Sequence, residues 1–173
     1  MNKTKEKLER IKYLYYYRGE KKEKDMPIDD IFVMIRDGKY ARQCDLMAQK
    51  ASALALNGEK TMPDNEDKLP SVVFGLTADD RYTGYIVMSF KCADMNEGLA
   101  KMRIAAQAPY TLMVFRSATR RALIVVAAYT LPDGTVPVGG DEEIFFNQHA
   151  YYSAALYYKA LLGLDIDMSA PHT

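Results

Sequence analysis

Two nearly continuous apolar runs constrain the fold of this chain more than any other feature. The first lies within residues 82–90, and the second is the Leu-Ile-Val-Val stretch inside residues 121–129. Short runs rich in β-branched and aromatic residues are typical of strands that are covered on both faces. The sequence therefore predicts a buried sheet with both runs in its interior.

The N-terminal third of the chain predicts one strand followed by two helices. Residues 11–17 are rich in β-formers and fit an edge strand, although part of this segment also has helical spacing. Pro27 and Gly38 delimit a short helix whose apolar residues recur at helical spacing. A second helix is expected over residues 40–58, followed by a flexible polar loop over residues 59–68.

Strands and helices alternate in the rest of the chain, and hairpins join neighbouring strands. The expected elements, in chain order, are strands 69–76 and 82–90, a helix from the capping box of Asp94 and Glu97 to Pro109, a hairpin of strands 110–117 and 121–129, a helix over 142–162, and a short strand over 164–167. This order predicts an α+β fold in which helices pack on a mainly antiparallel or mixed sheet. At 173 residues the chain is expected to form a single domain that includes a basic N-terminal arm over about residues 1–26.

The basic arm has two interpretations. Residues 1–24 hold nine Lys or Arg and four Glu, a net charge of +5, and the rest of the chain carries the opposite charge. The Lys-Lys-Glu-Lys segment at 21–24 fits a solvated loop better than a phosphate-binding site, because acidic residues are interspersed with the basic ones.

Tyrosine pairs and triplets occur at 15–17, 151–152 and 157–158. They can stack on nucleic-acid bases, but packing in a core or an interface explains them more simply. On the long helix, five positions fall near one stripe and favour such packing: Phe145, His149, Tyr152, Leu156 and Lys159 or Ala160.

Several motifs that carry chemistry are missing. No Walker loop, GxGxxG, HExxH or GxSxG element occurs, which excludes the enzyme classes built on them. Cys44 and Cys92 are far apart and fit buried thiols in a reducing compartment. His149 and His172 have no partner at metal-ligand spacing and fit core or solvated histidines. Without a signal peptide or an apolar stretch of membrane-spanning length, the chain is expected to be cytoplasmic and not bound to a membrane.

Five short segments, in a fixed order, carry a resemblance to a known family. They are Ile-Arg-Asp-Gly-Lys-Tyr at 35–40, Lys-Leu-Pro-Ser-Val-Val-Phe at 68–74, Tyr-Thr-Gly-Tyr-Ile-Val-Met at 82–88, Pro-Tyr at 109–110 with Phe-Arg-Ser at 115–117, and Tyr-Tyr at 157–158 with Gly-Leu-Asp-Ile-Asp at 163–167. Together they resemble the VirE N-terminal domain family, primase-like domains of bacterial mobile-element proteins in the archaeo-eukaryotic primase superfamily. The resemblance covers the chain from about residue 28 to its end and implies a primase-like sheet with an RRM-like core.

The resemblance also implies a two-metal site, and the residues here depart from it. In the superfamily, the strand that corresponds to residues 84–91 carries two acidic residues separated by one residue, so that both point to the same face. They hold divalent ions that align a nucleoside triphosphate with a 3′ hydroxyl. This chain has Ser89 and Lys91 at those positions. A serine is a poor Mg²⁺ ligand and a lysine ammonium repels the ions, so no metal and no catalytic residue are expected. Asp167 matches the family's late acidic residue but lacks its partners.

A second family element is a glycine-containing loop through which backbone amides approach phosphates. Its glycines are replaced in this chain, whereas Arg116, Ser117 and Arg121 persist and Arg120 adds a further positive charge. The resemblance therefore implies that an anion-binding loop remains.

Three hypotheses of function follow. The leading one is a catalytically degenerate primase-like domain of a mobile element that needs no cofactor and binds single-stranded or primed DNA, or a helicase or other replication protein. The second is a nucleotidyltransferase that uses Asp94, Asp165 and Asp167 as replacement ligands for Mg²⁺ or Mn²⁺. The third is an oligomerising domain that presents the tyrosine-rich helix to a partner.

Overall fold

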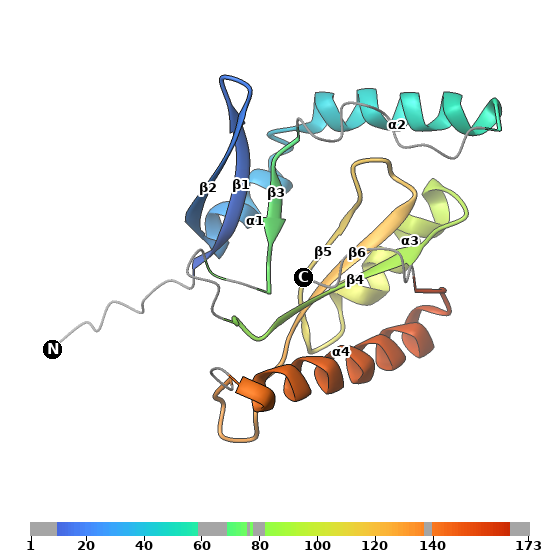
Figure 1. The fold of residues 1–173 in the computed structure, drawn as a ribbon. Helices are drawn as coiled ribbons and strands as arrows, with labels where there is room; N and C mark the ends of the chain where they lie inside the picture. The colour runs from blue at the N-terminus through green and yellow to red at the C-terminus, as the bar shows by residue number, and fades with distance from the viewer. Residues whose placement is uncertain (1–9, 59–68, 76, 78–81, 137–139, 167–173) are drawn as a thin grey trace, which may run out of the picture.

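The structure is a computed structural model that describes residues 10–58, 69–75, 77, 82–136 and 140–166. This part of the chain forms two three-stranded antiparallel sheets and four helices, which confirms the predicted α+β class (Figure 1). The loop predicted over 59–68, Asp167 and His172 lie outside the described residues. No helix in the described part of the chain is long and apolar enough to cross a membrane.

The first sheet has the strand order β2-β1-β3. β1 (Arg10–Tyr17) and β2 (Glu20–Pro27) form a hairpin, and β3 (Ser71–Val73) pairs with the other edge of β1. Arg18 and Gly19 between the first two strands both have a positive φ, of 52° and 83°. Two successive residues with positive φ are what a type I′ hairpin turn requires.

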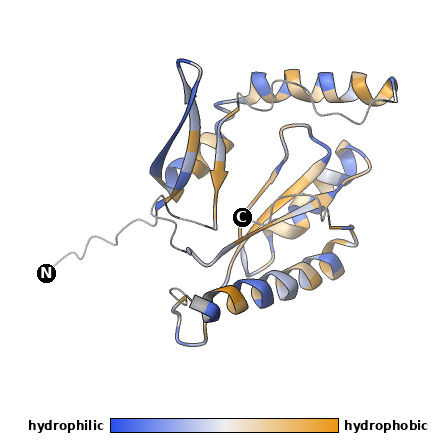
Figure 2. Cartoon of the chain, viewed as in Figure 1, coloured by the Kyte–Doolittle hydropathy of each residue, from blue (hydrophilic) through white to orange (hydrophobic). Residues whose placement is uncertain are grey.

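This sheet corrects three predictions. Residues 11–17, which were expected to form an edge strand, lie in β1, the middle strand of the sheet. The lysine-rich segment at 21–24 lies in β2 and not in a loop, and Figure 2 shows β2 as a mostly hydrophilic strand. Its Lys24 ammonium lies 5.7 Å from the ring centre of Tyr13 and 5.5 Å from that of Tyr15, so cation–π contacts join the two strands. The strand expected to pair with residues 82–90 is β3, which instead pairs with β1.

The second sheet has the strand order β4-β6-β5. β4 (Tyr85–Lys91) and β5 (Thr111–Arg116) flank β6 (Ala122–Ala128), and the hairpin of β5 and β6 is as predicted. The apolar run in β6 is central, but β4, which was also expected to be central, is an edge strand. A short last strand was expected over residues 164–167. In its place, an isolated antiparallel bridge joins Ile166 to Phe90 of β4.

Helices α3 (Met95–Ala106) and α4 (Gly140–Leu162) cover one face of the second sheet (Figure 1). Phe90, Leu123 and Tyr158 are fully buried between these helices and the sheet. The α3 N-terminus confirms the predicted capping box: the Asp94 carboxylate accepts a hydrogen bond from the Glu97 N–H at 2.9 Å, and the Glu97 carboxylate accepts one from the Ala93 N–H at 2.6 Å.

The opposite face of the second sheet packs against the first sheet and α1 (Ile28–Arg36). Ile11 of β1, Ile31 of α1 and Val126 of β6 are each fully buried in this second cluster. The two sheets therefore share one layer of core side chains. α2 (Ala41–Leu56) follows α1 and extends past the end of the second sheet in Figure 1.

The stripe of α4 that was predicted to pack in a core or an interface does not face the core of this chain, because its large side chains are exposed to solvent. Phe145, Tyr152 and Leu156 are 62%, 62% and 70% exposed. The buried side of the helix is a different stripe that includes Ala154 and Tyr158, whose hydroxyl lies 2.7 Å from the Thr111 hydroxyl. Small residues on that side allow the helix to approach the sheet closely.

Candidate functional site

The predicted anion-binding residues meet at the turn between β5 and β6. The Ser117 N–H donates a hydrogen bond to the Ala122 carbonyl, and the Arg120 N–H donates one to the Ser117 carbonyl, both at 2.9 Å. The Ser117 hydroxyl accepts a hydrogen bond from the Ala122 N–H at 3.2 Å and so helps to close the turn. Arg120 has a φ of 60°, a conformation that non-glycine residues rarely adopt.

Three of the four predicted side chains, Arg116, Arg120 and Arg121, line a groove of about 830 Å³, here called the arginine groove. The groove lies between this turn, α2 and the N-terminus of α3. Two carboxylates, those of Asp45 and Asp94, also line it, so three positive and two negative side chains leave a net charge of +1. Ser117 does not line the groove and acts within the turn.

Each arginine of the groove has a partner inside the protein. Arg120 forms a salt bridge with Asp45 of α2, and Arg121 donates a hydrogen bond to the Ala51 carbonyl of the same helix at 2.5 Å. Arg116 donates to the carbonyl of Arg120. These interactions attach α2 to the turn, and an anion that binds Arg120 must compete with Asp45.

Arg116 keeps one donor without an acceptor. Its Nε is buried and has no hydrogen-bond partner among the described residues. The side chain crosses α3 at Gly98, where a Cβ atom would come within 3.4 Å of Nε. Buried donors are nearly always satisfied, so this Nε is an exception, and because it has almost no exposed surface a ligand in the groove does not reach it unless the side chain moves.

Ser89 and Lys91 lie on the face of β4 opposite α3 and α4. Ser89 is 7% exposed, and its neighbours on that face are the apolar Val87 and, on β6, Ile124. A buried hydroxyl among apolar side chains, next to an ammonium, does not fit a divalent cation. Within the described residues, no group of three or more His, Cys, Asp or Glu side chains is placed to hold a metal ion.

The proposed replacement ligands have structural partners where the structure describes them. Asp94 caps α3, and the Asp165 carboxylate is 3.1 Å from the Lys159 ammonium with its side chain 83% exposed. The Asp165 carbonyl accepts a hydrogen bond from the Lys91 N–H at 3.0 Å, so the backbone of Asp165, and not its carboxylate, is tied to β4. Asp167 lies outside the described residues.

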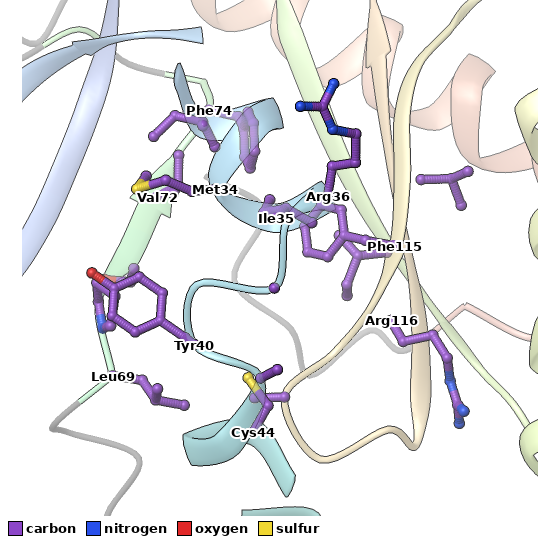
Figure 3. A pocket seen from close by; sticks show the side chains of 18 of the residues that line it. Met34, Ile35, Arg36, Tyr40, Cys44, Leu69, Val72, Phe74, Phe115 and Arg116 are labelled. Atoms are coloured by element: carbon purple, nitrogen blue, oxygen red, sulfur yellow. The ribbon is translucent and has the colours of Figure 1, made fainter. Parts of the chain in front are cut away.

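Sequence reasoning missed an apolar cavity of about 670 Å³ between the two sheets. Val87 and Ile124, which flank Ser89, line it together with Phe74 and Phe115. In Figure 3, Met34, Val72 and Phe74 gather on one side of the cavity, while the Arg36 and Arg116 side chains extend away from it. The cavity depends on how the first sheet packs, and no local sequence signal predicts that packing.

The nucleophilic groups beside these two hollows are not activated. Cys44 lines the cavity and Cys92 lines the groove, and burial raises the pKa of both thiols. Burial, followed by the hydrogen bond between the Tyr13 and Tyr40 hydroxyls at 2.9 Å, raises the pKa of Tyr13. A thiol or phenol with a raised pKa stays protonated near neutral pH and is a weak nucleophile.

Of the two histidines, only His149 lies within the described residues. It is exposed on α4, and its Nδ1 is 3.1 Å from the Phe145 carbonyl oxygen. This confirms a solvated histidine at that position.

The fold and the groove define an α+β domain with a buried antiparallel sheet and an arginine-lined hollow at one end of it. Residues 78–173 match the family described as "BT4734-like, N-terminal domain", and the chain belongs to this family. The matched segment begins after β3 and includes the second sheet, α3, α4 and the arginines of the groove. No curated protein and no solved structure matches the chain.

Proposed function

We propose that this chain is a catalytically degenerate primase-like domain whose arginine groove binds the phosphate backbone of single-stranded or primed DNA. One observation carries the proposal: three arginines from a single turn converge on one groove, while Ser89 and Lys91 stand where the VirE resemblance requires acidic ligands. The same resemblance supports the proposal that the domain also binds a helicase or another replication protein of a mobile element.

The groove has donors suited to phosphate. Arginine guanidinium groups bind phosphate oxygens with paired N–H donors, and the exposed side chains of Arg120 and Arg121 supply such donors. The α3 N-terminus also borders the groove, although the Asp94 carboxylate already caps it. With a net charge of +1 in the groove, affinity is expected to be modest and strongly reduced by salt.

Fluorescence anisotropy with labelled single-stranded and primed DNA, over a range of salt concentrations, tests the proposal. Arg120→Ala and Arg121→Ala are expected to weaken binding and to lower the salt slope by about 0.7 for each single-strand phosphate that the protein no longer neutralises. Arg103→Ala is the matched control, because Arg103 is exposed in the last turn of α3 and lines neither hollow.

Asp45→Asn gives a change of opposite sign. It removes the charge that holds Arg120, so DNA binding is expected to tighten by about 2–5-fold. Binding that is absent, or that is insensitive to salt and to all of these variants, would exclude the nucleic-acid part of the proposal.

Catalytic degeneracy has its own test. With Ser89 and Lys91 in place of the acids, we expect no primer synthesis or extension with Mg²⁺ or Mn²⁺ in gel assays that use an active primase as the positive control. Metal-dependent product, lost in Asp165→Asn or Asp167→Asn, would instead support the nucleotidyltransferase alternative.

A further inference from the structure

α4 carries a second apolar stripe on its solvent side, here called the outer stripe. Phe145, Tyr152 and Leu156 are 62%, 62% and 70% exposed. His149 lies between them in sequence, and its ring centre is 3.9 Å from that of Phe145. Steps of four, three and four residues place these side chains in one row along the helix. A continuous row of exposed large apolar side chains marks an interaction surface.

The two ends of the outer stripe carry opposite charges. Asp141 lies one turn before Phe145, Lys159 lies about one turn after Leu156, and both are exposed. Lys159 also contacts Asp165 of its own chain, yet its side chain remains 56% exposed. A partner helix that fits this stripe therefore needs a cation at one end, an apolar middle and an anion at the other end.

A second copy of α4 in antiparallel orientation meets this requirement. It places Phe145 of one copy opposite Leu156 of the other, and His149 opposite Tyr152, on both sides of a two-fold axis near residues 150 and 151. Asp141 then lies near Lys159 of the second copy, and the antiparallel helix dipoles also attract each other. In a parallel arrangement, like charges face each other at both ends.

We propose that two copies of this chain associate through their outer stripes, with the α4 helices antiparallel. Nucleic acid fits this surface less well than a second copy does. Affinity for phosphates depends on several lysines or arginines, and Lys159 is the one such residue in the described part of the stripe. The dimer leaves the arginine groove, which is formed by α2, α3 and the β5–β6 turn, outside the interface. Association of this kind is thus independent of the proposed function.

Sedimentation equilibrium of the full chain tests the dimer. The wild-type chain is expected to show a concentration-dependent monomer–dimer equilibrium, and Leu156→Glu is expected to raise the dimer Kd by roughly 30-fold or more. Leu56→Glu is the matched control, because Leu56 is 88% exposed on α2 and should leave the equilibrium unchanged. Circular dichroism checks that each variant is folded.

Charge exchange tests the orientation. Lys159→Glu is expected to weaken the dimer by about 2–5-fold, and adding Asp141→Lys to the same chain should restore it, since the exchanged charges meet again. A wild-type chain that stays monomeric at all concentrations overturns the proposal. So does a dimer that survives Leu156→Glu, or one in which the double exchange weakens association further.

Discussion

Gly84→Ala is expected to lower the free energy of unfolding by about 2–5 kcal/mol. Gly84 has a φ of +77°, in the left-handed region that costs an alanine about 1–2 kcal/mol. An added Cβ would lie 2.7 Å from the Tyr129 carbonyl oxygen and 2.5 Å from the Val136 side chain. The carbonyl cannot move freely, because the neighbouring Tyr129 N–H is bonded to the Gly84 carbonyl at 2.8 Å.

Gly134→Ala is the control that separates the two causes of this loss. Gly134 has a φ of +82°, but a Cβ there would meet no atom within 4 Å. It is therefore expected to cost only the backbone part, about 1–2 kcal/mol. Urea denaturation of both variants and the wild type provides the measurement. An equal decrease in the free energy of unfolding in the two variants would show that the residues around Gly84 accommodate a methyl group without a steric penalty.

Ser89→Asp is expected to destabilise the protein by up to about 3–5 kcal/mol at neutral pH, the loss that an uncompensated buried charge causes. Ser89 is 7% exposed and its nearest neighbours on that face, Val87 and Ile124, are apolar, so the new carboxylate loses its hydration, and the exposed Lys91 two residues along the strand offsets only part of that loss. Burial raises the pKa of such a carboxyl in the folded state above its unfolded value of about 3.9. The loss is therefore complete above the folded pKa and shrinks as the pH falls towards the unfolded pKa.

Thermal unfolding between acidic and neutral pH measures this effect, with Ser89→Asn as the matched control. The asparagine has a similar shape without a titrating charge, so its smaller loss should not depend on pH in this way. Millimolar Mg²⁺ is expected to leave the melting temperature of Ser89→Asp/Lys91→Asp unchanged. A clear rise would mean that this face of β4 can hold the ion once the two acids are supplied.

The sequence allowed prediction of the elements that local signals define. The Asp94 and Glu97 capping box, the β5–β6 hairpin and the central position of β6 were all confirmed. β2 was missed because most of its residues are charged and show no apolar alternation; it pairs with β1 along its whole length, and its Lys24 lies over the rings of Tyr13 and Tyr15. The position of β4 was predicted wrongly because a run of apolar residues reports burial on two faces, but not whether a strand has one neighbour or two.

Long-range packing accounts for the other differences. Nothing near β3 in the sequence indicates that it pairs with β1 instead of β4. On α4, apolar residues surround most of the helix, so spacing alone could not show that Tyr158 faces the core while Leu156 faces solvent. The arginine turn was predicted from the family resemblance, whereas its pairing with Asp45 depends on the position of α2.

Because β1 pairs with β3 and both pack against β6, the N-terminal sheet cannot be completed until the later strands have been synthesised on the ribosome. β1 emerges well before β3, its second partner strand, and the buried side chains of Ile11 and Tyr13 are covered only when β6 has also been translated. At ordinary translation rates, this interval is on the order of 10 seconds. During that time the nascent N-terminal hairpin exposes an unpaired strand edge and apolar side chains, the kind of surface that chaperones protect from aggregation.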